Sequence, residues 1–123
     1  MMMLLRRWFV LSTLICVTQG ALAVVSATEM ARIERLIQFV ESKHDIQFIR
    51  NGTSYSSQDA AKFMRGKFEM MGEHVTTAQQ FIDQIASKSS TTGQPYSIRF
   101  ADGKTMLVAK FLGDELKRMD RAP

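Results

Sequence analysis

Residues 46–57 read IQFIRNGTSYSS, and this stretch decides the fold. Asn51 and Gly52 readily adopt the positive φ angles of a type I′ turn, so the residues on either side are predicted to pair as a tight β-hairpin. The register of this hairpin places Phe48 opposite Tyr55. Residues 51–53 also match the acceptor sequence for N-glycosylation, but turn formation is the simpler explanation of the Asn-Gly pair.

A helix is predicted on each side of this hairpin. Before it, residues 28–43 have apolar side chains at the spacing of one helix face, with Thr28 in the N-cap position. After it, Ser56 or Ser57 caps a second helix that runs to about Met71, a residue on the apolar face of that helix.

The second half of the chain contains another helix and another hairpin. A third helix begins at Thr76 or Thr77, because each is followed three residues later by Gln in the spacing of a capping box. Residues 96–100 alternate between apolar and polar side chains, which predicts a strand. The chain then turns and returns over residues 105–109, and a short closing helix is predicted over residues 111–119.

These elements predict a single small α+β domain over residues 28–123, with about four helices packed with two short antiparallel β-hairpins. The chain has 123 residues, of which 46% are hydrophobic. A chain of this length buries one modest core and has no room for a separate cofactor-binding domain.

The first 27 residues have the order of a secretory signal peptide. The pair Arg6-Arg7 precedes an apolar run over residues 8–17, and small residues follow. Cleavage is predicted after Ala23 or after Ala27. The apolar run is about half as long as the roughly 20 residues of a transmembrane helix. We therefore expect export to the periplasm, with no stable transmembrane anchor after cleavage.

Removal of this segment changes the composition of the protein. The formal net charge falls from +4 to +2 when Arg6 and Arg7 are lost, and the single cysteine, Cys16, is lost with them. Cysteine-based chemistry is therefore excluded from the predicted mature protein. Its basic residues are dispersed among acidic ones, so a nucleic acid is not an expected partner.

Four blocks of the sequence stand out together. They are residues 48–52 (FIRNG), the pair Ala60-Ala61 followed by Lys67, residues 77–82 (TAQQFI) and residues 86–96 (ASKSSTTGQPY). Their order and spacing resemble the YfeK-like family of small exported bacterial proteins, a domain of unknown function. The resemblance covers roughly residues 33–116, and it implies export and a single domain but no activity.

This chain departs from the pattern of that family at one place. Members of the family often carry His where this chain has Phe63-Met64. The departure argues against a metal-binding or acid-base role for the second predicted helix.

No catalytic or metal-binding arrangement is evident in the sequence. The two histidines, His44 and His74, lack the spacing of a zinc motif, so no metal or other cofactor is predicted. A Ser-His-Asp set built from Ser89 or Ser90 with His74 and Asp45 would lack a nucleophile elbow and an oxyanion loop. The sequence therefore favours a non-enzymatic protein over a catalyst.

The candidate ligand site combines a Ser-rich segment with the first hairpin. Residues 87–93 can form a concave anion-binding nest of amide groups, to which Lys88 supplies charge. Alternatively, their hydroxyl groups cap the third helix and form turns. Arg50 joins the site if both hairpins share one sheet. The candidate ligand-binding residues are Arg50, Asn51, Tyr55, Lys88, Ser89, Ser90 and Tyr96.

These observations predict a binding or accessory module of the bacterial envelope, whose partner is another periplasmic protein or a small anionic ligand. The alternative is a small envelope hydrolase that uses the Ser-rich turn. A hydrolase requires a cleft around that turn and a titratable partner for its serine.

Overall fold

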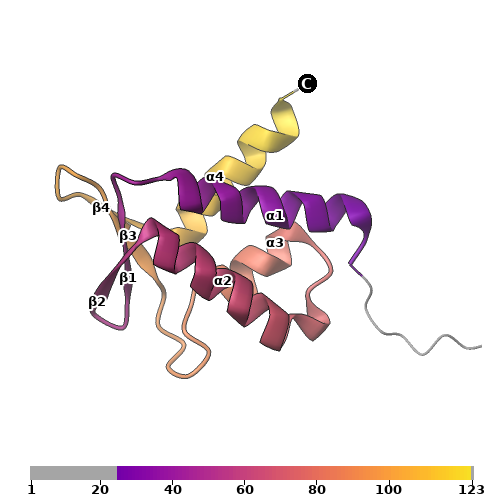
Figure 1. Ribbon diagram of the computed structural model, residues 1–123, viewed down its shortest axis with the longest axis horizontal. Helices are drawn as coiled ribbons and strands as arrows, with labels where there is room; N and C mark the ends of the chain where they lie inside the picture. Colours follow the sequence, from indigo (N-terminus) through magenta and orange to yellow (C-terminus); the bar gives the residue numbers. More distant parts are fainter. Residues whose placement is uncertain (1–24, 123) are drawn as a thin grey trace, which may run out of the picture.

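The computed structural model describes residues 25–122 and confirms a small α+β domain. Within these residues, helices and strands alternate in groups along the chain (Figure 1). The elements are α1 (Ala27–Ser42), β1 (Gln47–Arg50), β2 (Thr53–Ser56), α2 (Ser57–Met71), the 3₁₀ turn η1 (Gly72–His74), α3 (Ala78–Gln80), the π-helix η2 (Phe81–Ala86), β3 (Ser97–Arg99), β4 (Thr105–Leu107) and α4 (Val108–Arg121).

The strands form one antiparallel sheet in the order β2-β1-β3-β4. Asn51 and Gly52 have φ angles of 49° and 79°, and Phe48 pairs with Tyr55, so the predicted hairpin and its register are confirmed. β1 also pairs with β3, where Phe48 lies opposite Ile98. The two hairpins therefore share one sheet.

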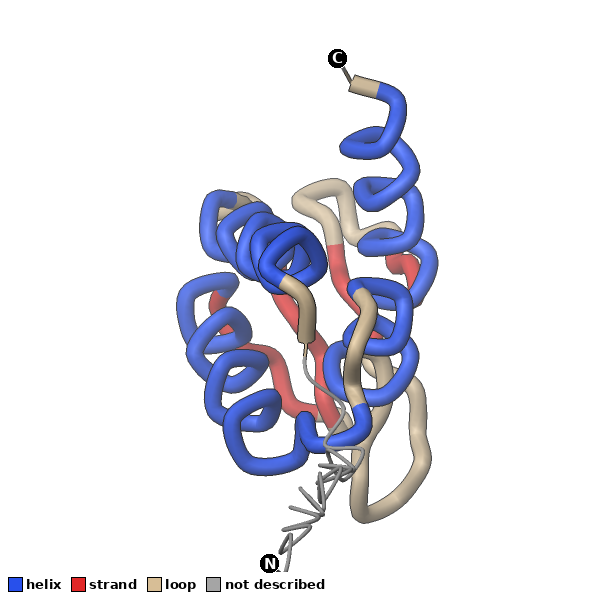
Figure 2. The backbone as a smooth tube through the Cα atoms, turned by 90° about the vertical axis from the view of Figure 1, so that its right-hand side faces the viewer, coloured by secondary structure: helices blue, strands red, loops and turns tan. Residues whose placement is uncertain are grey.

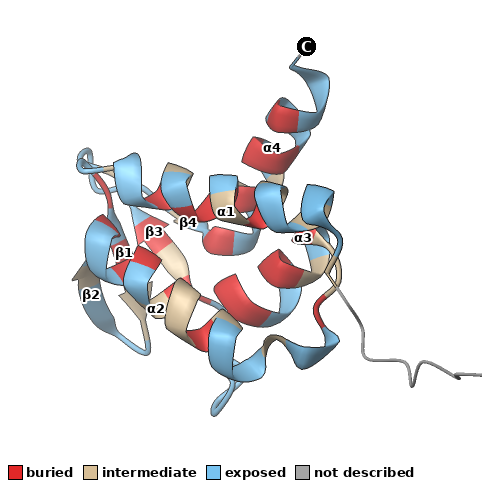
Figure 3. Ribbon diagram, turned by 45° about the vertical axis from the view of Figure 1, so that its right-hand side comes forward, coloured by how far each residue is buried: buried red, intermediate tan, exposed pale blue. Residues whose placement is uncertain are grey.

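The helices cover one face of this sheet (Figure 2). Phe48 and Ile98 point toward the helices and are buried, whereas Gln47 and Arg99 lie on the opposite, exposed face. The inner sides of the helices complete the core (Figure 3). Its largest fully buried side chain is Phe81, which packs edge to face against Phe68. The core thus lies between the sheet and the helices.

A hydroxyl side chain caps the N-terminus of each of the first three helices. Ser26, and not the predicted Thr28, is the N-cap of α1, because its hydroxyl oxygen accepts a hydrogen bond from the amide of Glu29 at 3.2 Å. Ser56 caps α2 and Thr77 caps α3 in the same way, which selects one of the two predicted residues in each case.

Other expectations differ from the structure in their details. The third helix widens into a π-helix at Phe81. The second hairpin ends at Leu107, and α4 begins at Val108, whose amide donates a hydrogen bond to the carbonyl of Tyr96 at 3.0 Å. Met71, predicted on the apolar face of α2, is 50% exposed at the last residue of that helix.

The predicted signal peptide falls mostly on residues 1–24, outside the described part of the chain. The later of its two predicted cleavage positions, after Ala27, falls at the first residue of α1. Between residues 25 and 122, no helix is long and apolar enough to cross a membrane.

Candidate functional site

A groove lies between α2, the β1–β2 hairpin and the loop over residues 88–96. It consists of two cavities that share Arg50, Phe63 and Tyr96. The smaller cavity, here called the apolar lobe, has a volume of about 230 Å³ and is also lined by Phe48, Ile49, Tyr55, Asp59, Ala60 and Met64. The larger, here called the cationic lobe, has a volume of about 400 Å³ and is also lined by Asn51, Gly66, Lys67, Met70, Met71, Ser89, Ser90 and Thr91.

Arg50 lies where the two lobes meet. Because side chains alternate along a strand, Arg50 points to the same face as Phe48, toward the helices. Its guanidinium carbon lies 4.1 Å from the ring centre of Phe63 and 5.3 Å from that of Tyr55. These cation–π contacts hold the charge beside aromatic rings. No carboxylate in the described part of the chain forms an ion pair with it.

Lys67 supplies the second positive charge of the groove. It lies on the buried face of α2 and is only 7% exposed. Its Nζ donates a hydrogen bond to the carbonyl of Lys88 at 2.7 Å and lies 5.4 Å from the ring centre of Tyr96. Burial lowers the pKa of Lys67, and the charges of Arg50 and Lys88 lower it further. Among residues 25–122 this amine has no carboxylate partner either.

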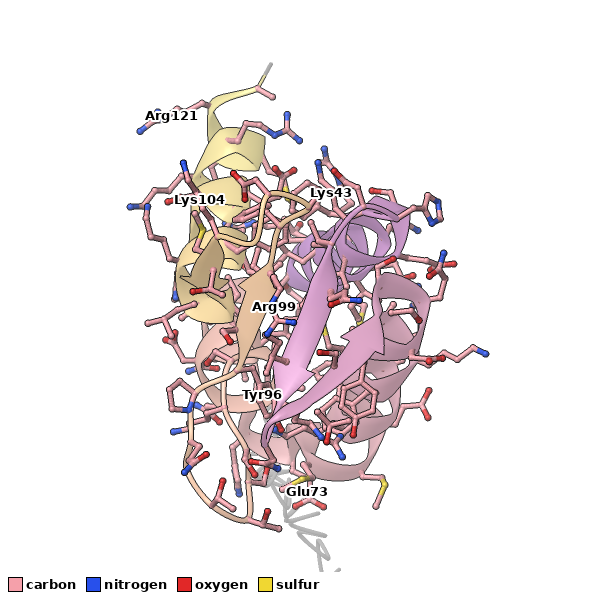
Figure 4. The ribbon with its side chains drawn as sticks, turned by 90° about the vertical axis from the view of Figure 1, so that its left-hand side faces the viewer. Lys43, Glu73, Tyr96, Arg99, Lys104 and Arg121 are labelled. Carbon is pink, nitrogen blue, oxygen red and sulfur yellow. The ribbon has the colours of Figure 1, made fainter. Side chains whose placement is uncertain are left out.

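Tyr96 lies just before β3 (Figure 4), where it is buried in the core and also lines both lobes of the groove. Its ring packs edge to face against Phe63, with ring centres 6.1 Å apart. Burial raises the pKa of Tyr96, although the Arg50 charge and the Ser89 hydroxyl act in the opposite direction. The phenol is therefore neutral at physiological pH and remains available as a hydrogen-bond donor.

The Ser-rich loop is organised by Ser89, which is 4% exposed. Its hydroxyl oxygen accepts hydrogen bonds from the amides of Thr91 and Thr92, each at 3.3 Å. Ser87 donates a hydrogen bond from its hydroxyl to the carbonyl of Asp83, near the end of the third helix. These hydrogen bonds are the turn and the helix cap expected as the alternative to an anion-binding nest. The amides of Thr91 and Thr92 thus point at the Ser89 hydroxyl.

The structure brings together six of the seven candidate ligand-binding residues. Arg50, Asn51, Ser89, Ser90 and Tyr96 line the cationic lobe, and Tyr55 lines the apolar lobe. The side chain of Lys88 is exposed, and its carbonyl holds Lys67 instead.

Sequence reasoning missed Lys67, Phe63 and Gly66 as members of the groove. A signal for Lys67 is present in the sequence, because it follows Met64 by three residues on the apolar face of α2. A lysine in the middle of an apolar stripe must either be solvated through its long side chain or be held by a buried partner.

The histidines and the aspartate considered for catalysis or metal binding lie outside the groove. His44 and Asp45 line a separate cavity beside the turn between β3 and β4, and His74 lies in η1. Neither His74 nor Asp45 lines the groove that contains Ser89. No group of three or more His, Cys, Asp or Glu residues that could hold a metal ion is present among residues 25–122.

The groove therefore offers two cations that lie beside aromatic rings and have no carboxylate partner among residues 25–122. Removing a cation from water is unfavourable unless a partner or a set of hydrogen bonds compensates for the lost hydration. An anion that enters the cationic lobe would provide such a partner to Arg50 and Lys67 together. The arrangement is suited to binding an anion.

Comparison with known proteins places the chain in a family. The model of a family of unknown function, DUF5329, matches residues 27–120. The chain is also 40% identical over 79 residues to "Uncharacterized protein YfeK" of Salmonella typhimurium; the match covers 64% of this chain and 66% of the relative, just under two thirds of its length. No solved structure matches the chain. The chain therefore belongs to DUF5329, the family of unknown function that includes the YfeK-like proteins.

Proposed function

We propose that this protein is an exported, non-enzymatic binding module of the bacterial envelope, and that it binds a small anionic ligand in the groove. The observation that carries the proposal is that Arg50 and Lys67 line one cavity of about 400 Å³ without a carboxylate partner among the described residues.

The electrostatics of Lys67 support this proposal. Its pKa is lowered first by burial and then by the positive charges of Arg50 and Lys88. A bound anion opposes this effect, so binding favours the protonated amine. The guanidinium of Arg50 presents a planar set of donors that matches a carboxylate or phosphate.

Titration of the purified protein tests the anion site. Calorimetry with acetate, benzoate and inorganic phosphate is expected to show binding of at least one of them to the wild type, weakened about tenfold or more by Arg50→Gln or Lys67→Met. Lys62→Met, on the exposed side of the same helix, and Arg99→Gln, on the open face of the sheet, are the matched controls and are expected to bind normally. Equal weakening by the controls would show that binding reflects only the overall charge.

Export is tested by fractionating cells that express the full chain. We expect the protein in the periplasmic fraction, cleaved after Ala23. Two contacts support this position over cleavage after Ala27: Ser26 caps α1, and Val25 packs against the core. Mass spectrometry of the isolated protein identifies the first residue. A protein that begins at Thr28, or one that keeps residues 1–23, would contradict the proposed processing.

A further inference from the structure

We propose that the ligand is a small carboxylate with an apolar chain, whose carboxylate lies between Arg50 and Lys67 and whose chain fills the apolar lobe. The proposal rests on the anion site described above and adds the chemical class of its ligand. Its basis is the juxtaposition of a cationic cavity and an apolar cavity that share Arg50.

The lining of the apolar lobe suits a hydrocarbon chain. Phe48, Ala60 and Met64 are buried, and the half-buried rings of Tyr55 and Phe63 form its walls. A water molecule occupies about 30 Å³ in the liquid, and a methylene group is of similar size, so 230 Å³ accommodates roughly six to eight carbon atoms. A ligand that is only an anion would leave this apolar surface in contact with water.

One carboxylate, Asp59, lines the apolar lobe, and its negative charge affects which part of a ligand this lobe accepts. Asp59 lies in the first turn of α2 and forms no ion pair among residues 25–122. An anionic group in this lobe would be repelled by Asp59, whereas an uncharged chain would not. The negative head of the ligand is thus directed to the cationic lobe and its apolar chain to the other.

The cost of removing anions from water favours a carboxylate over a phosphate as the head group of the ligand. A carboxylate with a single charge loses less hydration energy than a phosphate dianion when it enters a groove lined by rings. The guanidinium of Arg50 accommodates a carboxylate with two parallel hydrogen bonds. Gly66 adds no side chain to the cationic lobe, and the space beside it is open, since a Cβ built there would meet no atom within 4 Å.

A chain-length series tests the proposal on the purified protein. Acetate, butanoate, hexanoate and octanoate are titrated by calorimetry, with octan-1-ol as the uncharged control. We expect the dissociation constant to fall about threefold to fourfold for each added methylene group up to hexanoate or octanoate. Octan-1-ol is expected to bind at least tenfold more weakly than octanoate.

The outcomes separate this proposal from the anion site itself. Binding that depends on Arg50 but not on chain length would overturn the carboxylate-with-chain proposal and leave the anion site standing. Octan-1-ol binding as tightly as octanoate would contradict both, since the cations would then play no part. Binding of acetate without binding of octanoate would also overturn the proposal.

A substitution inside the apolar lobe gives a second, independent test. Ala60→Met partly fills the apolar lobe and is expected to remove the gain in affinity from butanoate to octanoate. Thermal unfolding reports whether this variant folds, and Lys62→Met serves as the control on the same helix. If a folded Ala60→Met protein showed the same dependence of affinity on chain length as the wild type, the hydrocarbon chain of the ligand would lie outside the apolar lobe.

Discussion

Two half-buried arginines in this molecule are stabilised in opposite ways. Arg32, on α1, forms ion pairs of 2.7 Å with Glu29 and Asp120, and so connects α1 to α4. Glu29 also accepts a hydrogen bond from the amide of Ala78 at 2.8 Å, which includes α3 in the same network. Arg50 has two aromatic rings as neighbours and no carboxylate within ion-pair distance among residues 25–122.

This difference separates a structural region from a binding region. Around Arg32, opposite charges connect α1 to α3 and α4, and these three helices also contact one another. Around Arg50, a second cation lies nearby in Lys67, and both line an open cavity. Charges at the first place are expected to stabilise the fold, whereas charges at the second contribute little to stability and are available to a ligand.

The largest effect is expected in the core, where Phe81→Ala removes a fully buried ring that packs against Phe68. We expect the free energy of unfolding to fall by about 3–5 kcal/mol, measured by chemical denaturation. The control is Met70→Ala, because Met70 is 82% exposed at the rim of the groove. This substitution is expected to change the free energy of unfolding by less than about 0.5 kcal/mol. A loss below about 1.5 kcal/mol for Phe81→Ala would mean that the core is less complete than described.

An intermediate effect is expected from the two arginines themselves. Arg32→Met breaks two ion pairs and leaves Glu29 partly unpaired, so it is expected to destabilise the protein by about 1 kcal/mol. Arg50→Met loses cation–π contacts but also relieves repulsion with Lys67, and its effect on stability is expected to be close to zero. The comparison fails if Arg50→Met destabilises the protein more than Arg32→Met does.

The smallest effect is a pH dependence caused by Lys67. Its pKa in the folded protein is lowered by burial and by the charges of Arg50 and Lys88, so between that pKa and the usual value of 10.5 the unfolded chain binds more protons than the folded one. Stability that depends on this residue therefore rises with pH across that window. Below the window, the charged amine destabilises the fold by a constant amount.

This effect is measured by comparing wild type with Lys67→Met at a series of pH values. The difference in the free energy of unfolding is expected to shift in favour of the wild type as the pH rises toward 10.5. Lys62→Met, at an exposed position of the same helix, is expected to show no such trend. A flat profile for Lys67→Met would mean that this amine is solvated in the folded protein.

The local parts of the fold were predictable from the sequence because their causes are local. Asn51-Gly52 sets the hairpin turn and thereby the pairing of Phe48 with Tyr55. The pairing of β1 with β3 joins residues about fifty positions apart, and no short-range pattern specifies it. From the sequence alone, Arg50 joins the site only on the condition that both hairpins share one sheet.

The site was predictable only in part, for a physical reason that Lys67 and Lys88 illustrate. Lys88 lies in the Ser-rich segment and was predicted to supply the charge, whereas the structure places Lys67 in the cavity and Lys88 at the surface. A lysine side chain is long enough to reach solvent from an apolar helix face, so its sequence position does not reveal whether it is buried. Only the packing of α2 against Tyr96 decides that.

The most direct test of the account is an NMR titration of the purified protein with octanoate. We predict that the shifts of backbone and side-chain resonances concentrate on the groove, at Arg50, Phe63, Lys67 and Tyr96, and leave the Arg32 network unchanged. Shifts that concentrate around Arg32, or an absence of shifts at saturating octanoate, would contradict the claim that Arg50 and Lys67 form the binding site.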